Sequence, residues 1–143
     1  MNEFTLGFSD GINNAIAVSI GLSFTNISKD VLLIAIISQI IGGSISMSLS
    51  YFQSLETLSY ILPLYVFFGY IVGGLIIISA YYITDNLKNG FTLSIVFNIV
   101  SLILLGYFRA YFLNQNIIDS IQKSLTIGII ALIVTYYTTK LIS

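Results

Sequence analysis

The chain has 143 residues, of which 57% are hydrophobic and 8% are charged, and its formal net charge is -1 at pH 7. This composition is typical of a membrane protein and excludes an ordinary water-soluble domain. The sequence contains no cysteine and no histidine, and its five basic residues are scattered. These counts exclude disulfides, thiolate or imidazole metal sites, histidine-dependent catalysis and a nucleic-acid-binding patch. We therefore expect neither an enzyme nor a bound cofactor.

The first hydrophobic segment is the least apolar one. Residues 11–27 alone fall short of the roughly 20 residues that a helix needs to cross a bilayer, but the preceding "EFTLGFSDG" extends them to full length. We predict a helix over residues 4–27 as the first membrane span, with Asp10 inside the membrane or at its edge. A cleaved signal peptide is the alternative. The lack of a basic start and the poor cleavage site in "FTNIS" argue against it.

Four further hydrophobic runs follow, and each has about the length of a membrane-spanning helix. The predicted helices cover residues 31–53, 60–83, 90–113 and 118–142. Because the connections are short and polar, no soluble domain fits between the spans. The sequence thus predicts an all-α membrane protein, a single domain over residues 1–143 with five transmembrane helices in the lipid bilayer. Its basic residues are divided too evenly to orient it.

Small residues recur at helical spacing in the first two predicted spans. Such stripes let helix backbones approach closely, which membrane helices use for association because lipid provides no hydrophobic drive between them. Packing of helices within one chain is the simplest explanation. We also predict that these residues form the face of a parallel homodimer. They are Gly7, Gly11, Ser38, Gly42, Ser46 and Ser50.

Asp10 is the acidic residue that lies deepest in a predicted span. An ionised carboxylate inside hydrocarbon costs roughly 2.5 to 3.5 kcal/mol on insertion scales, so such residues usually face a cavity or an ion path. Asn13 and Asn14 share a face of the predicted helix with it. The alternative is that Ser9 and Asp10 cap a helix beginning at Gly11, with the carboxylate in the headgroup layer. The sequence leaves both interpretations open.

Met47 lies at the centre of the polar stretch "GGSISMSLS". Methionine commonly fills gaps in apolar packing, and that is one explanation for it. Gln39, Gly43 and nearby serines on the same helix leave space and oxygen atoms beside its soft sulfur. A thioether together with a carboxylate and an amide oxygen suits a first-row divalent ion better than calcium or magnesium. The candidate residues of a metal and proton path are therefore Asp10, Met47, Asn14 and Gln39.

Two stretches, "DGINNAIAVSIG" and then "GGSISMSLSYFQS", resemble the paired first- and second-helix signatures of the vacuolar iron transporter (VIT) family. The likeness continues in "ILPLYVFFGYIVGGLIIISAYYI" and in the last two predicted helices. The resemblance implies a five-helix homodimer that moves ferrous iron, and sometimes manganese, out of the cytosol in exchange for protons. It also implies an ion path between the two protomers. By position, the family's first-helix aspartate falls on Asp10 and its second-helix methionine on Met47.

The sequence departs from that family pattern in two places. The family's second-helix signature usually continues with a glutamate, whereas this chain has Tyr51 at that position. Many members also carry a glutamate-rich cytosolic domain between the second and third helices, whereas here only "SLETLSY", with Glu56 as its sole acid, joins them. Metal capture from the cytosol should therefore be weak, and we predict no high-affinity metal site outside the membrane spans.

The main hypothesis is a minimal transporter of ferrous iron or manganese. In it Asp10 binds metal and exchanges protons, Met47 is a soft ligand, and Asn14 or Gln39 adds an oxygen contact. The alternative hypothesis is a non-transporting relative that keeps the fold and serves as a membrane scaffold or assembly partner. The Ile-, Asn- and Ser-rich composition and the absence of targeting features point to a prokaryotic cell membrane.

Overall fold

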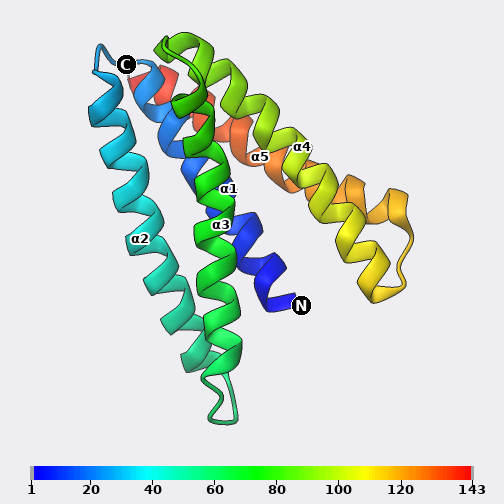
Figure 1. The fold of residues 1–143 in the computed structure, drawn as a ribbon. Coiled ribbons are helices and arrows are strands. Elements are labelled where there is room, and N and C mark those ends of the chain that lie inside the picture. The colour runs from blue at the N-terminus through cyan, green and yellow to red at the C-terminus, as the bar shows by residue number, and fades with distance from the viewer. Residues whose placement is uncertain (1, 143) are drawn as a thin grey trace.

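The computed structural model describes residues 2–142, which form five helices and contain no strand (Figure 1). The all-α prediction is thus confirmed for this part of the chain. The helices are α1 (Asn2–Ser23), α2 (Lys29–Ser54), α3 (Ile61–Ile83), α4 (Leu87–Leu113) and α5 (Ile117–Ile142). The last four lie close to the predicted ranges. The first begins and ends earlier than the predicted range 4–27.

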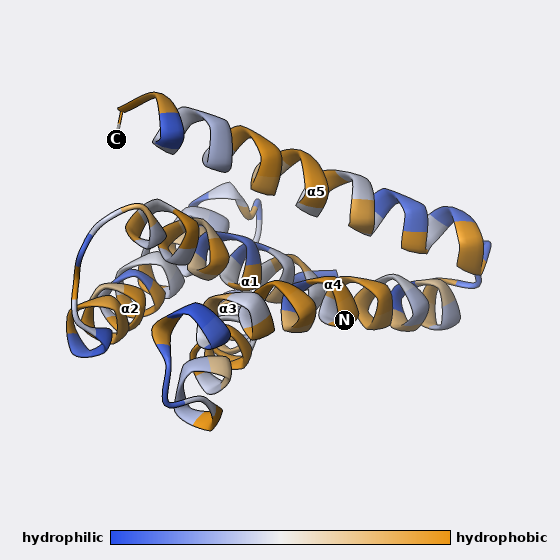
Figure 2. Ribbon diagram, turned by 90° about the horizontal axis from the view of Figure 1, so that it is seen from above, coloured by the Kyte–Doolittle hydropathy of each residue, from blue (hydrophilic) through white to orange (hydrophobic). Residues whose placement is uncertain are grey.

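Four of the described helices, α2 to α5, are long and apolar enough to cross a membrane. Figure 2 shows hydrophobic residues along most of their length and hydrophilic residues gathered at the connections. The chain is therefore an integral, multi-pass membrane protein. Helix α1 has 22 residues but is not among these four. The predicted count of five spans is accordingly not confirmed, and a membrane-spanning α1 stays a prediction.

The connections between the helices lie at two opposite ends of the bundle (Figure 1). At one end, the Lys29 Nζ donates a 2.8 Å hydrogen bond to the carbonyl oxygen of Thr84, which ties the α1–α2 connection to the α3–α4 connection. The last turns of α5 lie at this end too, where Tyr136 packs against Phe24 in a tilted arrangement with ring centroids 5.3 Å apart. The α2–α3 and α4–α5 connections lie at the other end. Neighbouring helices in the sequence are therefore antiparallel.

Helix α1 packs most closely against α3, and glycines on both helices make this approach possible. A Cβ atom on Gly11 would overlap the backbone of Tyr70, and one on Gly69 would overlap the carbonyl group of Phe4. The two backbones are thus in direct contact, as small residues at every fourth position allow. The contributing residues are Gly7 and Gly11 on α1 and Gly69 and Gly73 on α3.

This packing corrects one prediction about the dimer face. Gly7 and Gly11 are buried against α3 of their own chain, so neither has a surface left for a second protomer. The prediction that they help to form a dimer face is therefore wrong, whereas helix packing accounts for both. The stripe on α2 lies differently, since its members Ser38, Gly42, Ser46 and Ser50 are all exposed. An added Cβ on Gly42 would meet nothing within 4 Å.

The hydrophobic core lies where α1, α2 and α3 meet, and α4 covers part of it. Ile16, Ile36, Ile77 and Leu102 are each at most 1% exposed there. The outer faces of α2 to α5 carry many exposed large hydrophobic residues, such as Leu104 at 50% exposure. Such faces are stable against lipid tails but not against water. Helix α1 packs against all four other helices and contributes Ile12, Ile16 and Ile20 to this core.

Candidate metal site

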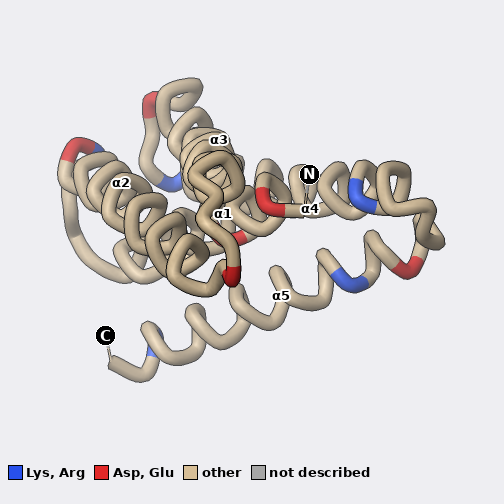
Figure 3. The backbone as a smooth tube through the Cα atoms, turned by 90° about the horizontal axis from the view of Figure 1, so that it is seen from below, with Lys and Arg blue, Asp and Glu red and all other residues tan. Residues whose placement is uncertain are grey.

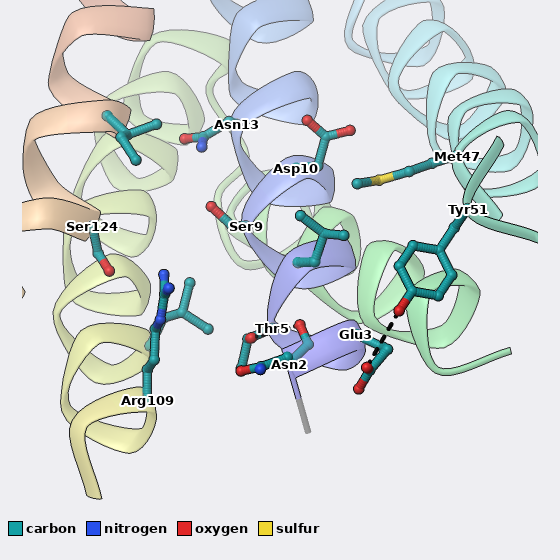
Figure 4. Close-up of a pocket in the computed structure, with 13 residues that line it drawn as sticks. Asn2, Glu3, Thr5, Ser9, Asp10, Asn13, Met47, Tyr51, Arg109 and Ser124 are labelled. Atoms are coloured by element: carbon teal, nitrogen blue, oxygen red, sulfur yellow. Dashed lines mark hydrogen bonds between the residues drawn. The ribbon is translucent and has the colours of Figure 1, made fainter. Parts of the chain in front are cut away.

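A cleft of about 430 Å³ opens beside the first half of α1 (Figure 4). Its walls come from α1, α2, α4 and α5, near the end of the bundle where the α2–α3 and α4–α5 connections lie. Five residues with ionisable groups or a soft sulfur line it: Glu3, Asp10, Met47, Tyr51 and Arg109. The cleft therefore brings together the two residues that the sequence singled out, Asp10 and Met47, and adds three others.

Asp10 lies two turns inside α1 and not at its start. Because the helix begins at Asn2, Asp10 does not cap it, and the capping interpretation is wrong. The side chain is partly buried and lines the cleft. Its Oδ2 atom accepts a 3.0 Å hydrogen bond from the Nδ2 of Asn14, one turn further along the helix. The carboxylate is thus held by a neighbour on one side and open to the cleft on the other.

Met47 extends from α2 toward α1, and its thioether points to the side of α1 that carries Asp10 (Figure 4). The residue is partly buried and lines the same cleft. Its role as a metal ligand stays a prediction. A thioether and a carboxylate that share one cleft form a pair of donors suited to a borderline-soft divalent ion.

Asn14 and Gln39 lie one layer deeper, away from the cleft lining. Both donate from their amide nitrogen atoms to the hydroxyl oxygen of Tyr70, a residue of α3 that is 1% exposed. Asn14 uses the same nitrogen to reach Asp10, so a hydrogen-bonded chain connects Asp10 to α3 and α2. The role of Asn14 and Gln39 as oxygen ligands of a metal stays a prediction. The structure places their nitrogen atoms in a supporting network.

Tyr51 occupies the position where the family signature places a glutamate. Its hydroxyl donates a 3.3 Å hydrogen bond to Oε1 of Glu3 on α1 (Figure 4). A carboxylate thus lies next to this position, although it comes from another helix. Glu3 precedes Asp10 by seven residues, a spacing that puts both on one face of a helix. That spacing was the signal by which sequence reasoning could have found Glu3.

The opposite wall of the cleft has a different character. Arg109 of α4 and Ser124 of α5 lie there, and Asn13 of α1 points toward them and away from Asp10 (Figure 4). The Oδ1 of Asn13 is buried without a hydrogen-bond partner among the described residues. The expected shared face of Asp10, Asn13 and Asn14 is therefore divided. Asp10 and Asn14 belong to the α2–α3 side, and Asn13 belongs to the α4–α5 side.

The acidic residues of the chain do not gather into one cluster. Within residues 2–142, no group of three or more aspartate or glutamate side chains lies close enough together to hold a metal ion. Figure 3 shows the charged residues scattered along the tube. The described part of one protomer therefore holds no acidic cluster for a metal, and Asp10 and Met47 as metal ligands stay a prediction.

Comparison with known proteins identifies the family. The family model described as the VIT family matches residues 1–62 and residues 59–140, and so covers nearly the whole chain. The two matched segments meet at the α2–α3 connection, the place where other members are expected to carry a cytosolic domain. A comparison with curated proteins gave no match. The chain therefore belongs to the VIT family, whose members are membrane metal-ion transporters and not enzymes.

Proposed function

We propose that this protein is a proton-coupled transporter of ferrous iron or manganese, with a path that runs between two copies of the chain. The proposal rests mainly on the cleft that Asp10 and Met47 share. Family membership supports metal-ion transport in general, and the cleft suggests where in this chain the metal would bind. A carboxylate supplies charge and a thioether supplies a soft donor. Magnesium and calcium prefer oxygen ligands alone, so the thioether favours ferrous iron over them. Manganese also prefers oxygen ligands, so its binding would depend mainly on the carboxylate.

The charges in the cleft indicate the side on which a cation would travel. Glu3 and Asp10 lie on the face of α1 next to α2, whereas Arg109 lies on the α4 side (Figure 4). A fixed positive charge repels a divalent cation, and repulsion is strong where little water screens it. The metal route therefore follows α1 and α2. Asp10 is the titratable group best placed on this route to exchange protons for metal.

A dimer would complete the ligand set that one protomer lacks. The exposed stripe of α2 lies beside Met47 on the same helix, and Gly42 and Ser46 leave its backbone open to a close neighbour. A two-fold axis along the membrane normal at this face would bring together two aspartates and two methionines. Two carboxylates near one axis repel each other, so they would release protons as a divalent cation binds.

The second candidate function is a membrane scaffold or assembly partner that keeps the fold without transport. Tyr51 in place of the signature glutamate and the short α2–α3 connection favour it, because both remove acidic groups that could collect metal. We favour transport because the Asp10–Met47 pair is retained within one cleft. The Ile-, Asn- and Ser-rich composition supports placement in a prokaryotic cell membrane.

Labelling of a cysteine at position 47 tests the cleft directly. Because the chain has no cysteine, the Met47→Cys variant carries a single thiol. We expect a membrane-impermeant, water-soluble thiol reagent to modify it, since the side chain lines an open cleft. Millimolar manganese should slow the reaction at least about tenfold, because metal bound next to Asp10 would cover the sulfur and compete for the thiolate. The rate is measured by mass spectrometry of the intact protein.

Two control positions provide the reaction rates expected for an inaccessible thiol and for a freely accessible one. Leu49→Cys places the thiol on an outward, 57% exposed apolar position of α2, which should stay unlabelled in the membrane. Glu56→Cys lies in the α2–α3 connection and should react at a rate that manganese leaves unchanged. Modification of Met47→Cys that neither manganese nor ferrous iron slows would contradict the role of Met47 as a ligand.

A further inference from the structure

Tyr70 of α3 is buried at the point where three helices meet. The residue is 1% exposed, and its hydroxyl oxygen accepts hydrogen bonds from Asn14 of α1 and Gln39 of α2. The Asn14 bond is 2.9 Å long. A buried polar group needs such partners, because an unsatisfied donor or acceptor away from water is costly. Tyr70 therefore joins α1 and α2 through one oxygen atom, although it belongs to neither.

Helix α2 lacks side-chain bulk where the Tyr70 hydroxyl lies, because a Cβ atom on Gly43 would overlap the hydroxyl end of the ring. Gly11 of α1 lies against the backbone of Tyr70, where a Cβ atom would also overlap. Gly43 thus provides the space for the hydroxyl, and Gly11 holds α1 close to the tyrosine backbone. This fit fixes the hydroxyl within narrow limits, because interiors packed this closely transmit small shifts of one group to its neighbours.

Asn14 carries the effect of Tyr70 to the cleft. Its amide nitrogen has two hydrogen atoms, and it donates to both Asp10 Oδ2 and the Tyr70 hydroxyl. The opposite amide orientation would turn the Asn14 oxygen toward the carboxylate, where the two would repel. With the Tyr70 oxygen in place, the nitrogen is held between two acceptors. The position of the Asp10 carboxylate therefore depends on a hydroxyl group that does not line the cleft.

The same oxygen also fixes the α2 side of the cleft. Gln39, Gly43 and Met47 follow one another at every fourth position of α2, so they lie on one face of that helix. Tyr70 contacts the first two, through the Gln39 amide and the space over Gly43. Met47 comes one turn later and reaches the cleft. The hydroxyl thus sets where the helix face carrying Met47 lies relative to Asp10.

We propose that Tyr70 is a positioning residue that sets the separation of the Asp10 carboxylate and the Met47 sulfur through its hydrogen bonds to Asn14 and Gln39. This inference rests on the proposed metal site. It adds a residue of α3 to a site otherwise built by α1 and α2. Tyr70 acts through other side chains and touches neither the cleft nor the metal.

The test compares Tyr70→Phe with Tyr81→Phe, which offers a matched control. Tyr81 is also a 1% exposed residue of α3, and its hydroxyl contacts Ser19 of α1, far along α1 from Asp10. Both changes remove one buried hydroxyl that joins α3 to α1. In manganese uptake by proteoliposomes, Tyr70→Phe should raise KM about 10- to 100-fold, the usual cost of losing a supporting partner of a ligand. Tyr81→Phe should leave KM unchanged.

A second variant and a second measurement keep the test independent of folding losses. Gly43→Ala retains the Tyr70 hydroxyl but forces it to move, so KM should rise in this variant too. The rise in unfolding temperature caused by manganese reports binding without transport. It should be reduced by Tyr70→Phe, retained by Tyr81→Phe, and absent from Asp10→Asn whether or not Tyr70 is also changed.

The outcomes separate the two claims. Normal uptake by the wild type with an unchanged KM in Tyr70→Phe would overturn the role of Tyr70 and leave the proposed function intact. An equal rise of KM in Tyr70→Phe and Tyr81→Phe would also overturn it, because a general loss of packing would then be the cause. If the wild type shows neither uptake nor stabilisation by manganese, the proposed function fails and the inference fails with it.

Discussion

Asp10→Asn should reduce manganese uptake by proteoliposomes by at least about 100-fold, because losing only a supporting partner of a metal ligand already costs 10- to 100-fold. The change removes the negative charge and the proton-exchanging group from the cleft. It keeps the shape of the side chain and an oxygen that can accept the hydrogen bond from Asn14. The variant should therefore fold and assemble as the wild type does. The loss of uptake can then be attributed to the missing carboxylate.

Ser9→Ala is the matched control for this change. Ser9 precedes Asp10 on α1 and lines the same cleft, but its hydroxyl points to the side away from Met47 (Figure 4). Its removal should change uptake less than about twofold, since an exposed or half-exposed hydroxyl contributes little. Uptake by Asp10→Asn within a factor of two of the wild type would show that the metal does not pass Asp10.

Gly11→Leu should destabilise the protomer by about 3 kcal/mol or more, at the upper end of what overpacking costs. Even a Cβ atom at this position would overlap the backbone of Tyr70, so a leucine must push α1 away from α3. That shift would also move Asn14 relative to the Tyr70 hydroxyl. We expect little monodisperse protein in detergent and a strongly lowered unfolding temperature, measured by size-exclusion chromatography after heating.

The same substitution at Gly42 separates packing within the protomer from packing between protomers. A Cβ atom there meets nothing within 4 Å, so Gly42→Leu should leave the folded protomer intact. The bulkier side chain would, however, keep a second copy away from the α2 stripe, and native mass spectrometry should show fewer dimers. An unchanged dimer fraction in Gly42→Leu would exclude this face, and a stable Gly11→Leu protein would contradict the close α1–α3 packing.

The fold was largely predictable because hydrophobic runs of membrane-spanning length alternate with short polar connections. Helix α1 was the exception, and it ends at Ser23 instead of residue 27. The next helix begins at Lys29, and the Ser28 hydroxyl caps it by accepting a hydrogen bond from the backbone N–H of Val31. Because a capping residue has a non-helical backbone, α1 must end before it. Hydropathy alone does not show this cap.

Candidate site residues could be predicted only where a residue type is unusual for the segment in which it occurs. A carboxylate in an apolar segment and a methionine in a polar stretch stand out, so the sequence singled out Asp10 and Met47, and both line one cleft. Tyr70 was missed because it is one of ten tyrosines and lies in an apolar run where aromatic residues are expected. Its meaning depends on three helices meeting at one point. The sequence also did not show that Asn13 and Asn14 point to different helices. Adjacent residues of a helix point about 100° apart, and only the packing of the other helices shows which of them each side chain faces.

The central claim is that divalent metal moves through this protein in exchange for protons. The most direct measurement follows manganese entry and internal pH together, in liposomes that contain the wild-type protein and a trapped pH-sensitive dye. The account predicts that added manganese enters with saturation and that the interior becomes more alkaline at the same rate, as protons leave. Manganese entry without any change of internal pH would contradict proton coupling. No entry over a range of pH, in vesicles holding the protein in both orientations, would contradict transport itself.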